Sequence, residues 1–253
     1  MHPIVILAGI LISASGARAD HDLAEVAALV NAGDAEVGAA AQRLAVARLH
    51  AALERARIVQ SEIDVVDQLQ RVLDEDSSVV LMPHEVVRLR AERSQLTSQL
   101  EAMQDESLSL RARLGAQALD AAEQPWVDPV ALDVRALSQA AQKSANPETR
   151  TSAASRVEAV AAKIATAQHR IDDDEQSVLP DLADALTSAL IDLPDGGSML
   201  DVIEALERAA SVRMQVVELQ LERERALVQL ELLTGAPLPA ARETPELIRV
   251  GGL

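Results

Sequence analysis

The feature that most constrains the fold is a long run of mostly apolar positions spaced alternately three and four residues apart. The run occupies residues 86–114 and contains no insertion; its positions are Val86, Leu89, Arg93, Leu96, Leu100, Met103, Ser107, Leu110 and Leu114. A repeat that averages 3.5 residues keeps one side of an α-helix against a partner helix over its whole length. The segment therefore predicts a long helix packed along its length against another helix.

A similar run near the end of the chain has a second apolar seam one position away from the first. The first seam is Val202, Leu206, Ala209, Val212, Val216, Leu219, Arg223, Ala226, Leu230 and Leu233, and the second is Leu200, Ile203, Ala210, Met214, Val217, Leu221 and Val228. An offset of one residue rotates a seam by about 100° around the helix. Such a helix needs a neighbour on each side, which favours an array of helices over an isolated two-stranded coiled coil.

Arg93 and Arg223 interrupt these seams. Each is expected to fix the register as a buried polar group, to pair with an acidic neighbour, or to extend its charged end into solvent.

Composition points to the same fold class. The chain is 49% hydrophobic but has no Phe, Tyr or Cys and a single Trp, so Ala, Leu and Val supply the apolar surface. These residues suit helices, whereas strands draw heavily on aromatic residues. The sequence predicts an all-α protein of long antiparallel helical hairpins in a coiled-coil array.

Turn signals divide the chain into two similar repeats, each with a short helix, a long helix, a tip and a return helix. In the first repeat the expected helices are residues 23–30, 34–73 and 83–114, with Gly115 as the cap; in the second they are 128–146, 148–190 and 199–233, with Gly235 as the stop. Asp128 and Pro129 form a suitable N-cap and first position. Pro180 predicts a kink or break near residues 178–181.

The expected domain boundaries follow from these repeats. They are a signal peptide at 1–19, the first hairpin repeat at 20–115, a linker at 116–127, the second hairpin repeat at 128–235 and a tail at 236–253.

The first residues have the form of a secretory signal peptide. An apolar run covers residues 4–12, and Ala17-Arg18-Ala19 forms a small-x-small cleavage site before Asp20. No Cys follows the site, so a lipid anchor is not expected. The formal net charge of −17 without a basic tract argues against nucleic-acid binding.

The quoted patterns resemble the TolC-like family of outer-membrane efflux proteins. The stretch GGSMLDVIEALERAASVRMQVVELQLERERALVQLELLTG, residues 196–235, is similar to the last long helix of that family, and residues 85–115 are similar to the equivalent helix of its first repeat. NPETRTSAASRVEAVAAKI, residues 146–164, resembles the Asn-Pro-Glu helix that opens a repeat.

One departure from the family matters. Its repeats insert pairs of β-strands that build, across three chains, a membrane barrel. Here residues 36–75 leave no room for a strand pair, no segment shows the ten-residue alternation of a membrane strand, and aromatic girdle residues are missing. The expected fold is therefore a helical relative with two internal repeats and no β-barrel.

The resemblance implies an exported component that acts in efflux or export across the cell envelope by helix–helix assembly with itself or with an adaptor protein. It implies a homo-oligomer, a trimer as in the family, with a membrane-fusion adaptor and an inner-membrane pump as partners. The expected location is the periplasm, in association with the outer membrane or free of it, with no membrane span of the chain's own. The alternative is a periplasmic coiled-coil scaffold without transport activity.

In the family the hairpin tips face the adaptor, so the resemblance implies a docking surface at the tips. Its residues are Val79, Leu81, Met82, Gly196, Gly197, Ser198 and Met199. Asp192 and Asp195 beside the second tip are candidates for an acidic constriction in a ring of subunits, or for simple helix capping.

The sequence carries no signal for catalysis, a cofactor or a metal. There is no Cys nucleophile, glycine-rich phosphate loop or nucleophile elbow. His169 lies three and four residues before Asp172 and Asp173, a spacing that a charged, exposed helix face explains better than a metal site. The expected function is therefore not enzymatic.

Overall fold

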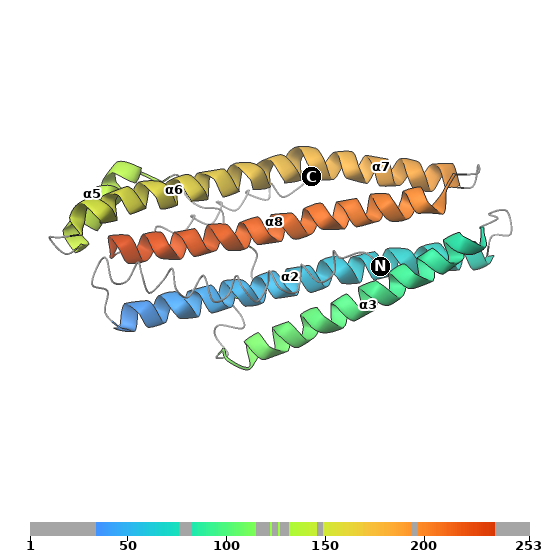
Figure 1. The fold of residues 1–253 in the computed structure, drawn as a ribbon, viewed down its shortest axis with the longest axis horizontal. Coiled ribbons are helices and arrows are strands. Elements are labelled where there is room, and N and C mark those ends of the chain that lie inside the picture. The colour runs from blue at the N-terminus through green and yellow to red at the C-terminus, as the bar shows by residue number, and fades with distance from the viewer. Residues whose placement is uncertain are drawn as a thin grey trace, which may run out of the picture. The chain divides into compact units, whose positions relative to one another are not determined.

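The structure is a computed structural model that describes residues 34–75, 82–114, 122, 126, 132–145, 149–193 and 197–235. Its helices are α2 (Asp34–Glu75), α3 (Pro83–Arg111), α5 (Val134–Ser144), α6 (Arg150–Asp173), the π-helical turn η1 (Asp174–Val178), α7 (Leu179–Asp192) and α8 (Met199–Thr234) (Figure 1). None of the described residues lies in a β-strand. The all-α prediction is confirmed.

The segments in which the family resemblance would place strand pairs are helical throughout. α2 runs without interruption from Asp34 to Glu75, and α6, η1 and α7 together stay helical from Arg150 to Asp192. The expectation that both strand pairs are missing from these segments is confirmed.

Pro180 does not break its helix. A proline lacks the N–H of the helical ladder, and its ring crowds the carbonyl four residues earlier. Here the π turn Asp174–Val178 widens the ladder just before it, and the Leu179 N–H bonds to the Asp174 carbonyl five residues back. Because Leu179 keeps helical angles (φ −65°, ψ −40°), the chain passes from α6 into α7 as one continuous helical path.

The second short helix starts later than predicted. α5 begins at Val134, and its N-cap is Asp133, whose side chain accepts a hydrogen bond from Ala136 N at 3.0 Å. Asp128 and Pro129 lie outside the described residues, as do residues 1–33, Gly115 and the tail from 236, so the signal peptide and the first short helix are not described.

The chain divides into two compact units. The first comprises Met1–Leu44, Gln124–Thr166 and Glu222–Leu253, and the second comprises Ala45–Glu123 and Ala167–Leu221. Both units therefore draw on segments from both predicted repeats.

In the first unit the last turns of α8 contact α5, α6 and the start of α2. The buried apolar core is Leu44, Ala141, Ala145, Ala153, Val157, Val160, Ile164, Ala226, Leu227, Val228, Leu230, Leu232 and Leu233. Gly235 ends α8 in the left-handed region at φ +66°, and its N–H donates to the Glu231 carbonyl at 2.9 Å. Ser144 Oγ joins α5 to this helix end by donating to the Thr234 carbonyl at 3.0 Å. The predicted stop at Gly235 is confirmed.

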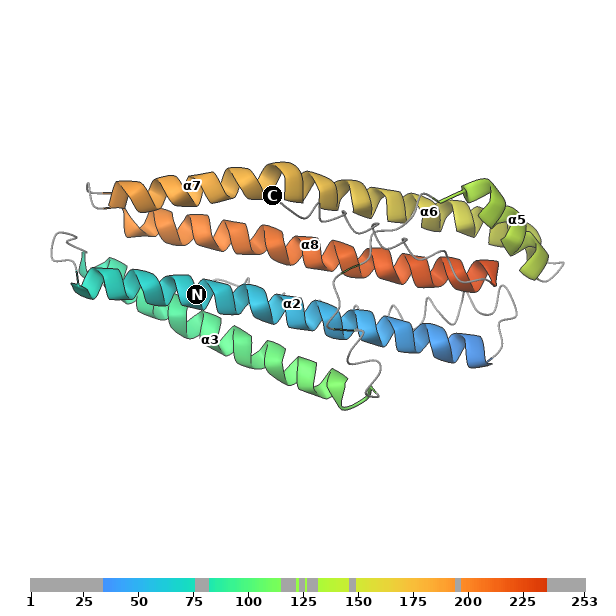
Figure 2. The same cartoon turned by 180° about the vertical axis from the view of Figure 1, so that it is seen from behind.

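In the second unit α8 lies beside α2 on one side and α7 on the other, as both ribbon views show (Figures 1 and 2). Its core is Val59, Ile63, Val66, Leu69, Leu89, Leu96, Leu193, Met199, Val202, Ile203 and Leu206, with a smaller cluster of Ile171, Val216 and Leu219. The α2 helix is tied to both of its neighbours by Arg55, which is 8% exposed. Its guanidinium donates to Glu218 Oε1 of α8 at 2.8 Å and lies 3.5 Å from Glu106 Oε1 of α3.

Burial confirms the double seam of α8. Every position of the first seam is buried except Val212, and every position of the second is buried except Leu200 and Met214; these three are half-buried. By contrast, the seam of α3 is only partly buried. Leu89, Leu96 and Ser107 are buried, and Val87 and Leu108 beside the seam are 67% and 60% exposed. The neighbours that the two seams require are present in each unit.

We expect Leu230→Ala to lower the free energy of unfolding by about 2–5 kcal/mol, because Leu230 is completely buried and truncation leaves a cavity. The matched control is Leu108→Ala, which removes the same atoms from an exposed site and should change stability by less than about 0.5 kcal/mol. Urea unfolding followed by circular dichroism measures both. Equal effects of the two variants would contradict the described core.

Candidate functional site at the hairpin tips

The Glu85 carboxylate joins the two hairpin tips in the second unit. Glu85 lies in the first turn of α3 and is 8% exposed. Its Oε2 accepts from Met82 N at 2.9 Å, in the manner of the glutamate in a capping box, and its Oε1 accepts from Met199 N at 3.2 Å. One side chain therefore satisfies backbone donors at the N-termini of both α3 and α8.

Ser198 completes the cap of α8. Its Oγ accepts from Leu200 N at 3.1 Å and donates to Glu85 Oε1 at 3.4 Å. A carboxylate at a helix N-terminus also interacts favourably with the helix dipole, and Glu85 does so for two helices at once. The two return helices thus begin from a shared polar junction.

Gly197 lets the chain turn closely between α7 and α8. Its N–H donates to the Asp192 carbonyl at 2.8 Å. A Cβ at this position would lie 2.7 Å from the carbonyl oxygen of Asp192 and 2.8 Å from its carbon. Because both atoms belong to the backbone, only glycine fits here without moving the turn.

The predicted tip residues have different surroundings. Met82 is 58% exposed, whereas Met199 is completely buried and packs with Leu193 in the core of the second unit. Asp192 is exposed, while Val79, Leu81, Asp195 and Gly196 lie outside the described residues. Of the predicted docking residues, the structure therefore brings Met82, Ser198 and Met199 together around Glu85, and only Met82 among these three presents a largely exposed side chain.

Sequence analysis gave Glu85 no structural role, since it weighed His84 and Glu85 only as a weak candidate for a metal site, and it did not single out Ile191. Glu85 is the third residue after Met82, the N-cap of α3, and a glutamate at this position is a capping-box signal. Its second hydrogen-bond partner, Met199, lies far away in the chain, so no local pattern predicts that contact. Ile191 is 67% exposed in the last turn of α7, beside the tip. Its exposure follows from packing and has no sequence signal.

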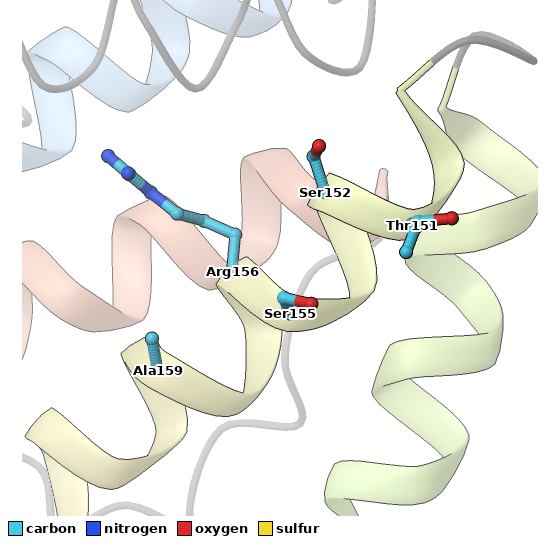
Figure 3. Close-up of a pocket in the computed structure, with 5 residues that line it drawn as sticks. All are labelled: Thr151, Ser152, Ser155, Arg156 and Ala159. Atoms are coloured by element: carbon cyan, nitrogen blue, oxygen red, sulfur yellow. The ribbon is translucent and has the colours of Figure 1, made fainter.

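A surface hollow on α6 is a weaker candidate for a binding site than the tips are. It has a volume of about 380 Å³ and is lined by Thr151, Ser152, Ser155, Arg156 and Ala159, all from one helix face (Figure 3). All five lining residues come from one helix, and no second element among the described residues lines the hollow.

The described part of the chain holds no group of His, Cys, Asp or Glu side chains arranged to bind a metal ion, and His169 is exposed there. None of its helices has the length and apolar content needed to cross a membrane.

Comparison with known proteins gives a similarity of fold. No protein-family model matches the sequence, and no curated protein matches it. Among solved structures, the outer membrane protein VceC from the bacterial pathogen Vibrio cholerae superposes with a TM-score of 0.59 at 16% sequence identity. The match covers 87% of this chain and 74% of VceC.

The chain shares the fold of VceC. With sequence identity this low, the likeness concerns the arrangement of the helices and not the activity of either protein. It agrees with the resemblance to outer-membrane efflux proteins that the helical repeats indicate.

We expect Glu85→Ala to destabilise the junction, because it leaves backbone donors of two helices without their acceptor. The expected loss is about 1–3 kcal/mol in the free energy of unfolding, with faster hydrogen–deuterium exchange at the amides of Met82 and Met199. Glu101→Gln, which changes an exposed glutamate of the same helix, should leave this exchange unchanged. Unaltered protection of the Met199 amide in Glu85→Ala would refute the shared cap.

We expect Gly197→Ala to lower the free energy of unfolding by about 1–3 kcal/mol, because the added Cβ meets the Asp192 backbone. Gly38→Ala is the control, since a Cβ there meets nothing within 4 Å in the interior of α2. That variant should gain about 0.5–1 kcal/mol from helix propensity. Thermal melting of both proteins checks the opposite signs.

Proposed function

We propose that the protein is an exported helical component that acts in efflux or export across a cell envelope. It assembles through its helices, with further copies of itself or with an adaptor protein. The observation that carries this proposal is the shared fold with an outer membrane protein over 87% of the chain. The resemblance of both helical repeats to TolC-like efflux proteins supports it from the sequence side.

The proposal gives the hairpin tips the docking role. The Glu85 junction holds the two tips of the second unit together, so that they would meet a partner as one rigid surface. Exposed apolar side chains beside that junction, Met82 and Ile191, are of the kind that protein interfaces bury. Asp192 is exposed on the same tip and would contribute a negative charge to the interface.

The proposal extends to assembly and location. The protein would act in the periplasm or at the outer membrane as a homo-oligomer, a trimer by analogy with the resembling family, together with a membrane-fusion adaptor and an inner-membrane pump. No enzymatic step belongs to this role, because helix packing and docking alone perform it.

Site-specific cross-linking tests the docking role. The chain has no native Cys, so Met82→Cys can carry a photoactivatable cross-linker as the only thiol. We expect the labelled tip to cross-link an envelope protein or a second copy of the chain. Leu108→Cys is the matched control, because it is equally exposed on α3 but lies outside the tip. Equal cross-linking from both sites would argue against a docking tip.

Cell fractionation and light scattering test the wider proposal. An exported, oligomeric chain found in the envelope fraction supports it. A stable monomer that stays in the cytoplasm would overturn it. If the protein is exported and oligomeric but deletion of its gene leaves efflux from the cells unchanged, the result would favour the alternative of a scaffold without transport activity.

A further inference from the structure

Glutamates from three helices of the second unit lie close together, and one arginine contacts two of them. Glu92 of α3 is 6% exposed, and Arg88 Nη2 lies 3.8 Å from its Oε2. The same Arg88 nitrogen lies 2.8 Å from Oε1 of Glu207 in α8. The negative charge of Glu207 is close enough to Glu92 to raise the pKa of the Glu92 carboxyl group.

Glu62 of α2 is the third member of this cluster and is also 6% exposed. The charged groups that face it are Glu92 from α3, and Glu207 and Arg213 from α8. No side chain within the described residues forms a hydrogen bond or ion pair with the Glu62 carboxylate. An ionised carboxylate buried in this way is costly, so the neutral form is favoured.

The cluster is built into the packing of the unit. Ile63, Leu89 and Leu206 belong to its apolar core, and they lie next to or one turn away from the glutamates in the chain. If all three glutamates ionise, Arg88 and Arg213 leave one negative charge uncompensated, and Arg88 is itself half exposed. When these glutamates lose their protons, their negative charges repel one another at the place where α2, α3 and α8 pack together.

The titration of Glu62 falls in an accessible pH range. Burial, followed by the charge of Glu92, raises the pKa of Glu62 from 4.5 to about 7. Burial also raises the pKa of Glu92, with a further contribution from Glu207, while Arg88 opposes the rise. A carboxyl group with a raised pKa in the folded state binds its proton more tightly there than in the unfolded chain. Its contribution to stability is thus present below pH 4.5 and is lost as the pH rises to about 7.

We propose that Glu62 of α2 and Glu92 of α3, beside Glu207 of α8, form a proton-dependent latch that holds the three helices together while both are protonated and loosens them when both are ionised. The latch goes beyond the proposed function and does not depend on it, because it concerns the packing of the second unit alone.

Thermal melting at pH 5.5 and pH 8.0 tests the latch. We expect the wild-type protein to melt at least about 5 °C higher at pH 5.5. Glu62→Gln should remove most of this difference, because its neutral amide has no proton to lose. Glu101→Gln makes the same substitution at an exposed site of α3 and should keep the difference. The same pH dependence in Glu62→Gln and Glu101→Gln would overturn the proposal.

A distance measurement tests the loosening directly. Exposed Ser94 of α3 and Ser211 of α8 can be changed to Cys and spin-labelled, since the chain has no other thiol. We expect the distance distribution between the labels to be narrow at pH 5.5 and broader at pH 8.0, and to be the same at both values when Glu62→Gln is added. Identical distributions at both pH values in the otherwise wild-type protein would refute the latch.

Discussion

The structure depends on one constraint, which is that α8 is apolar on two adjacent faces. A helix of this kind leaves a seam in water unless neighbours cover both faces. In the second unit α2 and α7 flank it, and in the first unit α5, α6 and the start of α2 do so. Because Ala, Leu and Val form the seams, the helices approach closely without aromatic side chains.

Polar groups set the register of the helices, which is the alignment of one helix along the next. The two arginines that interrupt the seams behave differently. Arg93 is exposed and pairs with Asp67 of α2 at 2.6 Å, whereas Arg223 is only 1% exposed. Burial raises the pKa of Glu224 beside it, while Arg43 and then Arg223 lower that pKa. Arg43 of α2 lies 3.5 Å from Glu224. Apolar seams tolerate a shift by one heptad, whereas ion pairs between helices, such as Arg93–Asp67 and Arg43–Glu224, match only one register.

The tip junction and the glutamate cluster are two polar devices at different points of the same packing. Glu85 is fully supplied with donors, so its carboxylate stabilises the start of both return helices. Glu62 has two carboxylates and one guanidinium facing it, so its ionisation opposes the packing. The same residue type thus joins helices at one place and makes their contact conditional on pH at another, and the difference lies in the available donors.

The sequence by itself determined the fold class, the long helices and the position of most turns, because heptad spacing and Gly or Pro signals are local. The double seam of α8 and the stop at Gly235 are of this kind. Local signals were incomplete where the backbone had an alternative. Near Pro180, where the sequence predicted a kink or a break, a π turn keeps the helix continuous, and at α5 the cap is Asp133. Only the tertiary structure decided that Glu85 caps two helices, that Met199 is buried, and that Glu62, Glu92 and Glu207 meet. These features join residues far apart in the chain, and their energies depend on burial and on neighbours that no local pattern specifies.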